Sequence, residues 1–155
     1  MKKYLLILIF FVLLAACNTE TATEPEEFEG NTEEKRSEML DKGVEYYLNT
    51  MTNKYSSAFT LSTTNEEKAK YLNEAITDIN LAVQDIEDNY EEGTPPTQEL
   101  FDLADSLLKS IESELTGDSE SAYDSSYDAG VLIRQLSDEY LGGELPFGIQ
   151  LLMDK

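Results

Sequence analysis

The sequence contains no histidine and no tryptophan, and its single cysteine is Cys17. Without histidine, and with no cysteine further along the chain, neither a Cys–His nor a Ser–His nucleophilic pair can form, and the usual zinc ligand sets are excluded. A lone cysteine also excludes an intrachain disulfide, so a folded domain has to be stable through its core alone. We therefore expect no catalytic centre, no resident metal and no cofactor, and we interpret the protein as a non-enzyme.

Basic residues are scarce as well. The chain has 11 lysines and arginines against 32 aspartates and glutamates, which gives a formal net charge of −21. So strong a negative charge repels the phosphates of nucleic acids, and we therefore expect no nucleic-acid partner. Three interpretations remain open: a solvated surface that keeps the domain soluble, binding of cations, and a partner with a basic surface. The solvated surface is the simplest of the three.

The first residues are typical of an export signal. Lys2 and Lys3 form a positively charged start, and the apolar run from Tyr4 to Leu14 is too short for a membrane-spanning helix, which needs about 20 apolar residues. The run ends in the tetrapeptide LAAC at 14–17, in which two small residues precede the cysteine. The start of the chain therefore predicts export rather than a permanent membrane span.

This tetrapeptide resembles the lipobox of bacterial lipoproteins. In that family the cysteine thiol receives a diacylglycerol and a signal peptidase cuts before the cysteine, so the resemblance implies a signal peptide over 1–16 and cleavage between Ala16 and Cys17. It also implies acyl chains such as palmitate on Cys17, and two chains hold a protein stably on a lipid bilayer where one is marginal. The resemblance thus implies a lipid-anchored protein on the extracytoplasmic face of the cell membrane. The alternative is an ordinary secretory signal that is cleaved elsewhere.

Residues 18–30 read NTETATEPEEFEG and show no apolar periodicity. Threonine and glutamate dominate this segment, and such a composition cannot bury enough apolar surface to fold. We therefore predict that 17–30 comprise the lipidated cysteine and a flexible acidic tether. Without Lys2 and Lys3, 9 basic residues stand against 32 acidic ones, a net charge of −23 for the mature chain.

The rest of the chain contains four segments in which apolar residues recur every three or four positions, as one face of an α-helix requires. No segment alternates like a β-strand, and the turns near 62–65, 91–96 and 116–119 are short, so neighbouring helices should be antiparallel. We predict an all-α fold, an up-down four-helix bundle over 31–143. The predicted core consists of Leu40, Val44, Tyr47, Met51, Tyr55 and Ala58, then Leu72, Ile76, Ile79, Val83, Ile86 and Tyr90, then Leu100, Ala104, Leu107, Leu108, Ile111 and Leu115, and finally Ala122, Ala129, Leu132, Ile133, Leu136 and Tyr140.

Turn and capping residues separate these segments. Thr64 is followed three positions later by Glu67, which is the pattern of a capping box at a helix start. Gly93 can end the second helix in the left-handed conformation that glycine tolerates, and Gly117-Asp118 can end the third helix and cap the fourth. The tail over 144–155 carries six large apolar side chains, one directly before and five after Pro146. We predict that this tail packs on the bundle, and the alternative is a free partner-binding segment.

Two groups of side chains are candidates for a binding site. Asp118, Glu120, Asp124 and Asp128 crowd the start of the fourth segment, but their spacing does not match the calcium-binding loop, and acidic residues in a first turn already complement the helix dipole. We therefore predict no metal site there.

The second group is the pair Tyr123 and Tyr127, which lie one helical turn apart and alternate with Asp124 and Asp128. Tyrosine is enriched at protein interfaces, and the neighbouring carboxylates suit a basic partner, so these four residues form the candidate interface. The alternative is that the two rings pack loosely at the rim of the core.

The overall organisation resembles that of small helical surface lipoproteins of bacteria. We interpret the protein as a membrane-anchored, acidic, extracytoplasmic lipoprotein that acts by protein–protein contact at the cell envelope, as an accessory or inhibitor of envelope machinery. Its expected partners are the lipid bilayer, through the acylated Cys17, and an envelope protein with a basic surface. The alternative function is a binding protein for cations or cationic small molecules.

Overall fold

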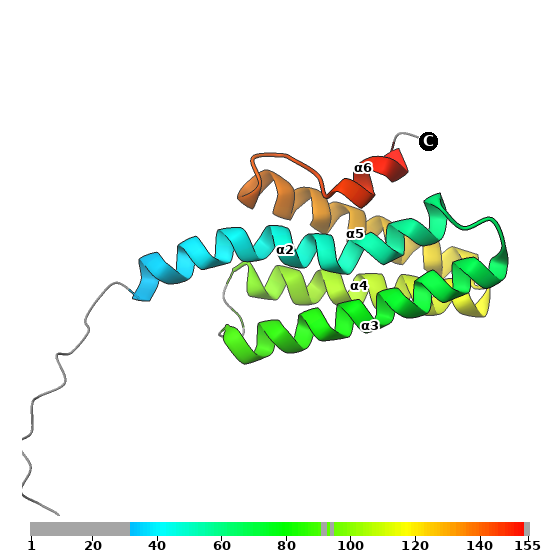
Figure 1. Ribbon diagram of the computed structural model, residues 1–155, viewed down its shortest axis with the longest axis horizontal. Coiled ribbons are helices and arrows are strands. Elements are labelled where there is room, and N and C mark those ends of the chain that lie inside the picture. The colour runs from blue at the N-terminus through cyan, green and yellow to red at the C-terminus, as the bar shows by residue number, and fades with distance from the viewer. Residues whose placement is uncertain (1–31, 91–92, 94, 154–155) are drawn as a thin grey trace, which may run out of the picture. The chain divides into compact units, whose positions relative to one another are not determined.

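The computed structural model describes residues 32–90, 93 and 95–153, and it describes side chains from Gly43 onward. The predicted signal peptide, Cys17 and the tether lie outside the described residues. Within the described ranges every regular element is a helix, which confirms the all-α prediction (Figure 1). The elements are α2 (Thr32–Thr60), α3 (Asn65–Asn89), α4 (Thr97–Thr116), α5 (Ser119–Tyr140) and the short α6 (Phe147–Met153). Of these helices, none is both long and apolar enough to cross a membrane.

Capping side chains fix two of the helix starts, as the sequence predicted. The Thr64 hydroxyl accepts a hydrogen bond from the Glu67 amide at the start of α3, 3.1 Å away. The Glu67 carboxylate in turn accepts hydrogen bonds from the Thr63 amide and hydroxyl, which hold the pKa of that carboxyl below its usual range. At the next junction Gly117 ends α4 with a φ of 83°, and Asp118 caps α5 by accepting from the Ser121 amide.

The prediction that Gly93 ends the second helix was wrong. The helix α3 ends at Asn89, and Tyr90 already adopts an extended conformation with φ −131° and ψ 151°. The ring of Tyr90 packs edge-on against Tyr47 of α2, with 6.2 Å between ring centroids. Gly93 does have a positive φ of 80°, but it lies in the turn that follows, so it serves the turn and not the helix end.

Helices α2 and α3 lie against each other and run in opposite directions. The Tyr47 hydroxyl, early in α2, donates a hydrogen bond to the Asp85 carboxylate late in α3, at 2.6 Å. Further along α2, Lys54 contacts Glu74 in the first half of α3, with 2.8 Å between Nζ and Oε2. Because later residues of α2 meet earlier residues of α3, the two helices are antiparallel. Burial, together with the bond to Asp85, raises the pKa of Tyr47.

Polar contacts also join the remaining long helices. The ammonium of Lys68 in α3 pairs with the carboxylate of Glu114 in α4. Near the middle of the molecule, the Tyr55 hydroxyl of α2 and the Ser110 hydroxyl of α4 lie 2.9 Å apart, and Ser110 also donates to the backbone carbonyl of Ala122 in α5, at 3.2 Å. Ser110 therefore links α2, α4 and α5 at one point of the core.

The core confirms most of the predicted stripes and corrects them at several positions. Sequence analysis missed Leu48 and Leu103, which are fully buried, because the predicted stripes ran through the adjacent Tyr47 and Ala104; both neighbours are buried as well, so the buried face is wider at these points than predicted. Leu115 was wrongly assigned to the core: it is 40% exposed, in the last turn of α4, beyond Ile111, the last buried residue of that helix. Leu40 falls among the side chains that are not described. The buried cluster comprises Val44, Tyr47, Leu48, Met51, Tyr55, Ala58, Leu72, Ala75, Ile79, Ala82, Ile86, Leu100, Leu103, Ala104, Leu107, Ile111, Ala129, Ile133 and Leu136.

The C-terminal tail forms α6, which lies on α2. Leu145 and Ile149 pack against the core, and Gly148 is buried at the point of closest approach. A Cβ atom at Gly148 would lie 2.8 Å from the Ser56 Oγ and 3.1 Å from the Ser56 Cβ. Phe147, by contrast, is exposed on the other side of α6. Only a glycine therefore allows α6 to sit this close to α2.

Replacing Gly148 with alanine should lower the free energy of unfolding by about 1–3 kcal/mol, the usual cost of overpacking. Either α6 shifts away from α2, or the Ser56 side chain rotates and loses its hydrogen bond to the Thr52 carbonyl, now 2.7 Å long. Gly130→Ala is the matched control, because a Cβ there meets no described atom within 4 Å while the helix gains the same propensity. Urea denaturation measures the free energy of unfolding of both variants. Equal values would contradict the close approach of α6 to α2.

Candidate interaction surface

The candidate interface predicted from the sequence lies on the solvent side of α5. Tyr123 and Tyr127 are 69% and 64% exposed, and Asp124 and Asp128 are exposed beside them. Asp128 also lies near Lys109 of α4: the hydrogen bond from Lys109 to Asp105 raises the pKa of that ammonium group, and the charge of Asp128 adds to the effect. The two rings thus present most of their area to water.

The structure extends this row of side chains by one member that sequence reasoning missed. Val131 follows Tyr127 by four residues and is 51% exposed, so Tyr123, Tyr127 and Val131 form an apolar row over three consecutive turns. The opposite face of α5 is buried through Ala129 and Ile133. Helix α5 therefore carries apolar residues on two faces, one in the core and one in water. The spacing of four residues was the signal in the sequence that could have identified Val131.

A groove of about 450 Å³ opens beside Tyr123. Helices α2, α4, α5 and α6 all contribute to its walls, so no single segment of sequence could reveal it. Its lining comprises Tyr55, Phe59, Ser110, Glu114, Ser119, Ala122, Tyr123, Ser126, Gly130, Ile149 and Leu152. We call this cavity the α5–α6 groove.

The polar groups of the α5–α6 groove are largely occupied by one another. The Tyr55 hydroxyl contacts Ser110, which in turn donates to the backbone of α5, and the Ser126 hydroxyl donates to the Tyr123 carbonyl at 2.8 Å. Burial raises the pKa of Tyr55, so this phenol stays neutral near pH 7. Apolar surface comes from Phe59 of α2 and from α6. The groove thus offers an apolar space above a floor of satisfied hydroxyl groups.

Acidic side chains surround the groove on the α5 side. Glu120 and Asp124 lie within one turn of Tyr123, and Glu114 lines the groove itself while it pairs with Lys68. Arg134, one turn beyond Gly130, is the single basic residue between 119 and 140. The ammonium of Lys68 also lies over the Phe59 ring of the groove wall, 4.5 Å from the ring centroid, and offsets the charge of Glu114. The unpaired negative charge near the groove therefore comes from Glu120 and Asp124 of α5.

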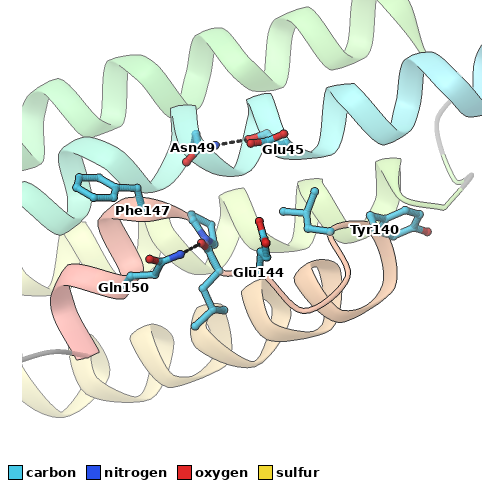
Figure 2. Close-up of a pocket in the computed structure, with 9 residues that line it drawn as sticks. Glu45, Asn49, Tyr140, Glu144, Phe147 and Gln150 are labelled. Carbon is cyan, nitrogen blue, oxygen red and sulfur yellow. Dashed lines mark hydrogen bonds between the residues drawn. The ribbon is translucent and has the colours of Figure 1, made fainter.

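A second cavity, of about 500 Å³, lies on the other side of α6 (Figure 2). Glu45 and Asn49 of α2 line one side, and the segment from Tyr140 to Gln150 lines the other. Two amide side chains in it are held by local backbone: Asn49 donates to the Glu45 carbonyl at 3.0 Å, and Gln150 donates to the Leu145 carbonyl at 2.6 Å. Glu45 and Glu144 give this cavity an acidic lining. Helix α6 thus forms a wall of both cavities.

The predicted absence of a metal site at the start of α5 stays a prediction. Asp118 is engaged as a helix cap, and hydrogen bonds from Ser121 hold the pKa of its carboxyl below the usual range. In the part of the chain that the structure describes, no group of three or more acidic side chains is placed to hold a metal ion.

No protein-family model matches the chain, and searches of curated proteins and of solved structures likewise find no similar protein.

Proposed function

We propose that this protein is a membrane-anchored, acidic, extracytoplasmic lipoprotein that acts by contact with another protein at the cell envelope, as an accessory or inhibitor of envelope machinery. The tetrapeptide LAAC at 14–17, with its lipobox resemblance, supports the anchor on Cys17. The four long helices then act as an up-down four-helix bundle that presents α5 to the partner. On this proposal the protein is not an enzyme, and its contact surface is its functional site.

The observation that carries the proposal is the exposed apolar row on α5. Tyr123, Tyr127 and Val131 each keep more than half of their surface in water, so they expose apolar area that the core of the fold does not use. Tyrosine is among the residues that contribute most to binding at protein interfaces. Contact with a partner would remove this area from water, at about 25 cal/mol for each Å² buried.

Charge indicates the kind of partner. Asp124 and Asp128 flank the two rings, and the whole chain has a net charge of −21. A basic surface on the partner would be attracted to this face and would associate faster at low salt. Electrostatic complementarity thus favours a cationic protein over an acidic one.

The double change Tyr123→Ala with Tyr127→Ala should remove crosslinks to the partner in intact cells. Truncated interface hot spots lose about 2 kcal/mol or more of binding free energy. Because both rings are mainly exposed, the helical circular-dichroism signal and most of the thermal stability should stay unchanged. Crosslinking with mass spectrometry, combined with thermal melts, measures both quantities.

Tyr46→Ala is the matched control for this experiment. Tyr46 is an equally exposed tyrosine, 61%, on α2, and its removal should leave the crosslinks in place. If the double variant keeps its crosslinks, α5 is not the contact surface. If it melts at a much lower temperature, the rings support the core and the interface proposal fails.

The alternative function, binding of cationic small molecules, finds its support in the cavity of Figure 2. Glu45 and Glu144 supply carboxylates there, and Tyr140 and Phe147 supply aromatic rings, which attract cations through their faces. Calorimetric titration with Ca²⁺ and with a polyamine separates this function from protein contact. A cation-binding protein should release or absorb heat when either cation is added, whereas a protein that acts by protein contact need not.

A further inference from the structure

We propose that the α5–α6 groove receives one bulky apolar side chain of the partner, and that lysine or arginine residues flank this side chain in the partner's sequence. This inference rests on the proposed function and specifies the chemistry of the partner. It extends the contact surface from the exposed row on α5 into a cavity that four helices build.

The size and lining of the groove indicate a side chain rather than a whole helix. A volume of about 450 Å³ lies at the lower end of the range for ligand pockets, about 300–1,000 Å³. An α-helix is about 10–12 Å wide with its side chains and would need a longer trough. Phe59, Ile149 and Leu152 provide apolar contacts, and the hydroxyls of the floor already have hydrogen-bond partners. An apolar group can therefore enter without leaving polar atoms unpaired.

Gly130 keeps this space open. It lies in the middle of α5 without a positive φ, so the backbone does not require a glycine at this position. Glycine is, after proline, the least favourable residue in a helix interior. A Cβ at Gly130 would meet no described atom within 4 Å, so a larger side chain has room to project into the groove. Because glycine has no side chain, this position leaves space in the groove that the side chain of almost any other residue would occupy.

The charges near the entrance of the α5–α6 groove favour particular residues of the partner on either side of its apolar side chain. Glu120 and Asp124 lie within one turn of Tyr123 on α5, and Arg134 lies one turn beyond Gly130. Glu114 of the groove lining pairs with Lys68, which offsets its charge, so the two carboxylates of α5 provide the attraction. Lysine or arginine beside the inserted side chain would find carboxylates within reach, whereas glutamate would meet like charge.

The absence of tryptophan from this chain makes the proposal measurable by fluorescence. The probe is a short synthetic peptide with one tryptophan between two lysine pairs, and the matched peptide carries glutamates in place of the lysines. Each is titrated into the full mature chain held in phosphatidylcholine bilayers, with protein-free bilayers as the blank. We expect a saturable blue shift of the indole emission with the lysine peptide and none with the glutamate peptide.

Two substitutions at one position test the groove itself. Gly130→Leu fills the cavity and should weaken binding of the lysine peptide by about tenfold or more. Gly130→Ala adds one methyl group and should weaken binding less than Gly130→Leu does. Asn80→Leu places a leucine on the exposed face of α3, outside the groove, and should bind like the unchanged protein. Ser126→Leu fills the groove from the preceding turn of α5 and serves as the second blocking variant if Gly130→Leu loses its helical signal.

Several results would overturn the proposal. One is that the lysine peptide does not bind saturably, and another is that the glutamate peptide binds equally well. A third is that a blocking variant, Gly130→Leu or Ser126→Leu, folds and still binds the lysine peptide as strongly as the unchanged protein. Crosslinking in cells separates this inference from the proposed function. If the Tyr123→Ala, Tyr127→Ala protein keeps its crosslinks, the proposed function fails; if it loses them while Gly130→Leu keeps them, only the groove inference fails.

Discussion

Replacing Ile79 with aspartate is expected to unfold the domain. Ile79 lies in the middle of α3 with no exposed surface, among the buried residues of the core. An ionised carboxylate without a partner costs several kcal/mol in such a place, and a domain of ordinary stability has only about 5–15 kcal/mol in total. Thermal melts followed by circular dichroism should show a loss of the cooperative transition, or a melting temperature far below that of the unchanged protein.

Asn80→Asp is the matched control, because it introduces the same charge one residue later on the exposed face of α3. Its melting temperature should stay close to that of the unchanged protein. Glu74→Gln tests a different contribution: it weakens the pair with Lys54, and surface ion pairs contribute little. If Ile79→Asp and Asn80→Asp melt at the same temperature, the assignment of the buried face of α3 is wrong.

The change Cys17→Ser should abolish membrane anchoring altogether. The lipobox resemblance implies that a thiol accepts the diacylglycerol, and a serine hydroxyl does not replace it in that reaction. Labelling of cells with a palmitate analogue should therefore give no signal on the variant, and the uncleaved precursor should accumulate. Fractionation of the cells should show the loss of the mature, lipid-bound form.

Ser125→Ala, a change on α5 far along the sequence, provides the control for this experiment because it leaves the targeting segment untouched. That variant should be labelled and cleaved like the unchanged protein. Normal processing and membrane retention of Cys17→Ser would contradict the lipoprotein prediction and would favour an ordinary secretory signal.

Local signals in the sequence were sufficient to predict the helices. The hydroxyl of Thr64 and the carboxylate of Asp118 cap α3 and α5 as expected, because a cap depends on atoms within a few residues of each other. The recurrence of apolar residues every three or four positions identified most of the core, because this pattern too depends only on residues within one or two helical turns. Gly93 shows where this reasoning stops: the contact of Tyr90 with Tyr47, a residue far away in the sequence, accompanies the end of α3 before the glycine is reached.

The candidate site depends more on contacts between helices and was therefore predicted only in part. Tyr123 and Tyr127 share one helix face, so their spacing was enough to place them together. The α5–α6 groove combines side chains that are up to about a hundred positions apart, and periodicity carries no information on such pairs. Gly148 is a further example, since its importance arises from the position of Ser56 on another helix.

The way in which α6 packs on α2 also determines how easily this short helix can detach. A helix of 7 residues has little stability of its own, so α6 stays in place through a few contacts around Gly148 and Ile149. Segments with so few contacts open locally, at a free-energy cost below that of global unfolding. Each such opening would remove the wall shared by the two cavities and join them into one trough. Amide hydrogen exchange in the last turns of the chain therefore reports how often the groove loses its shape.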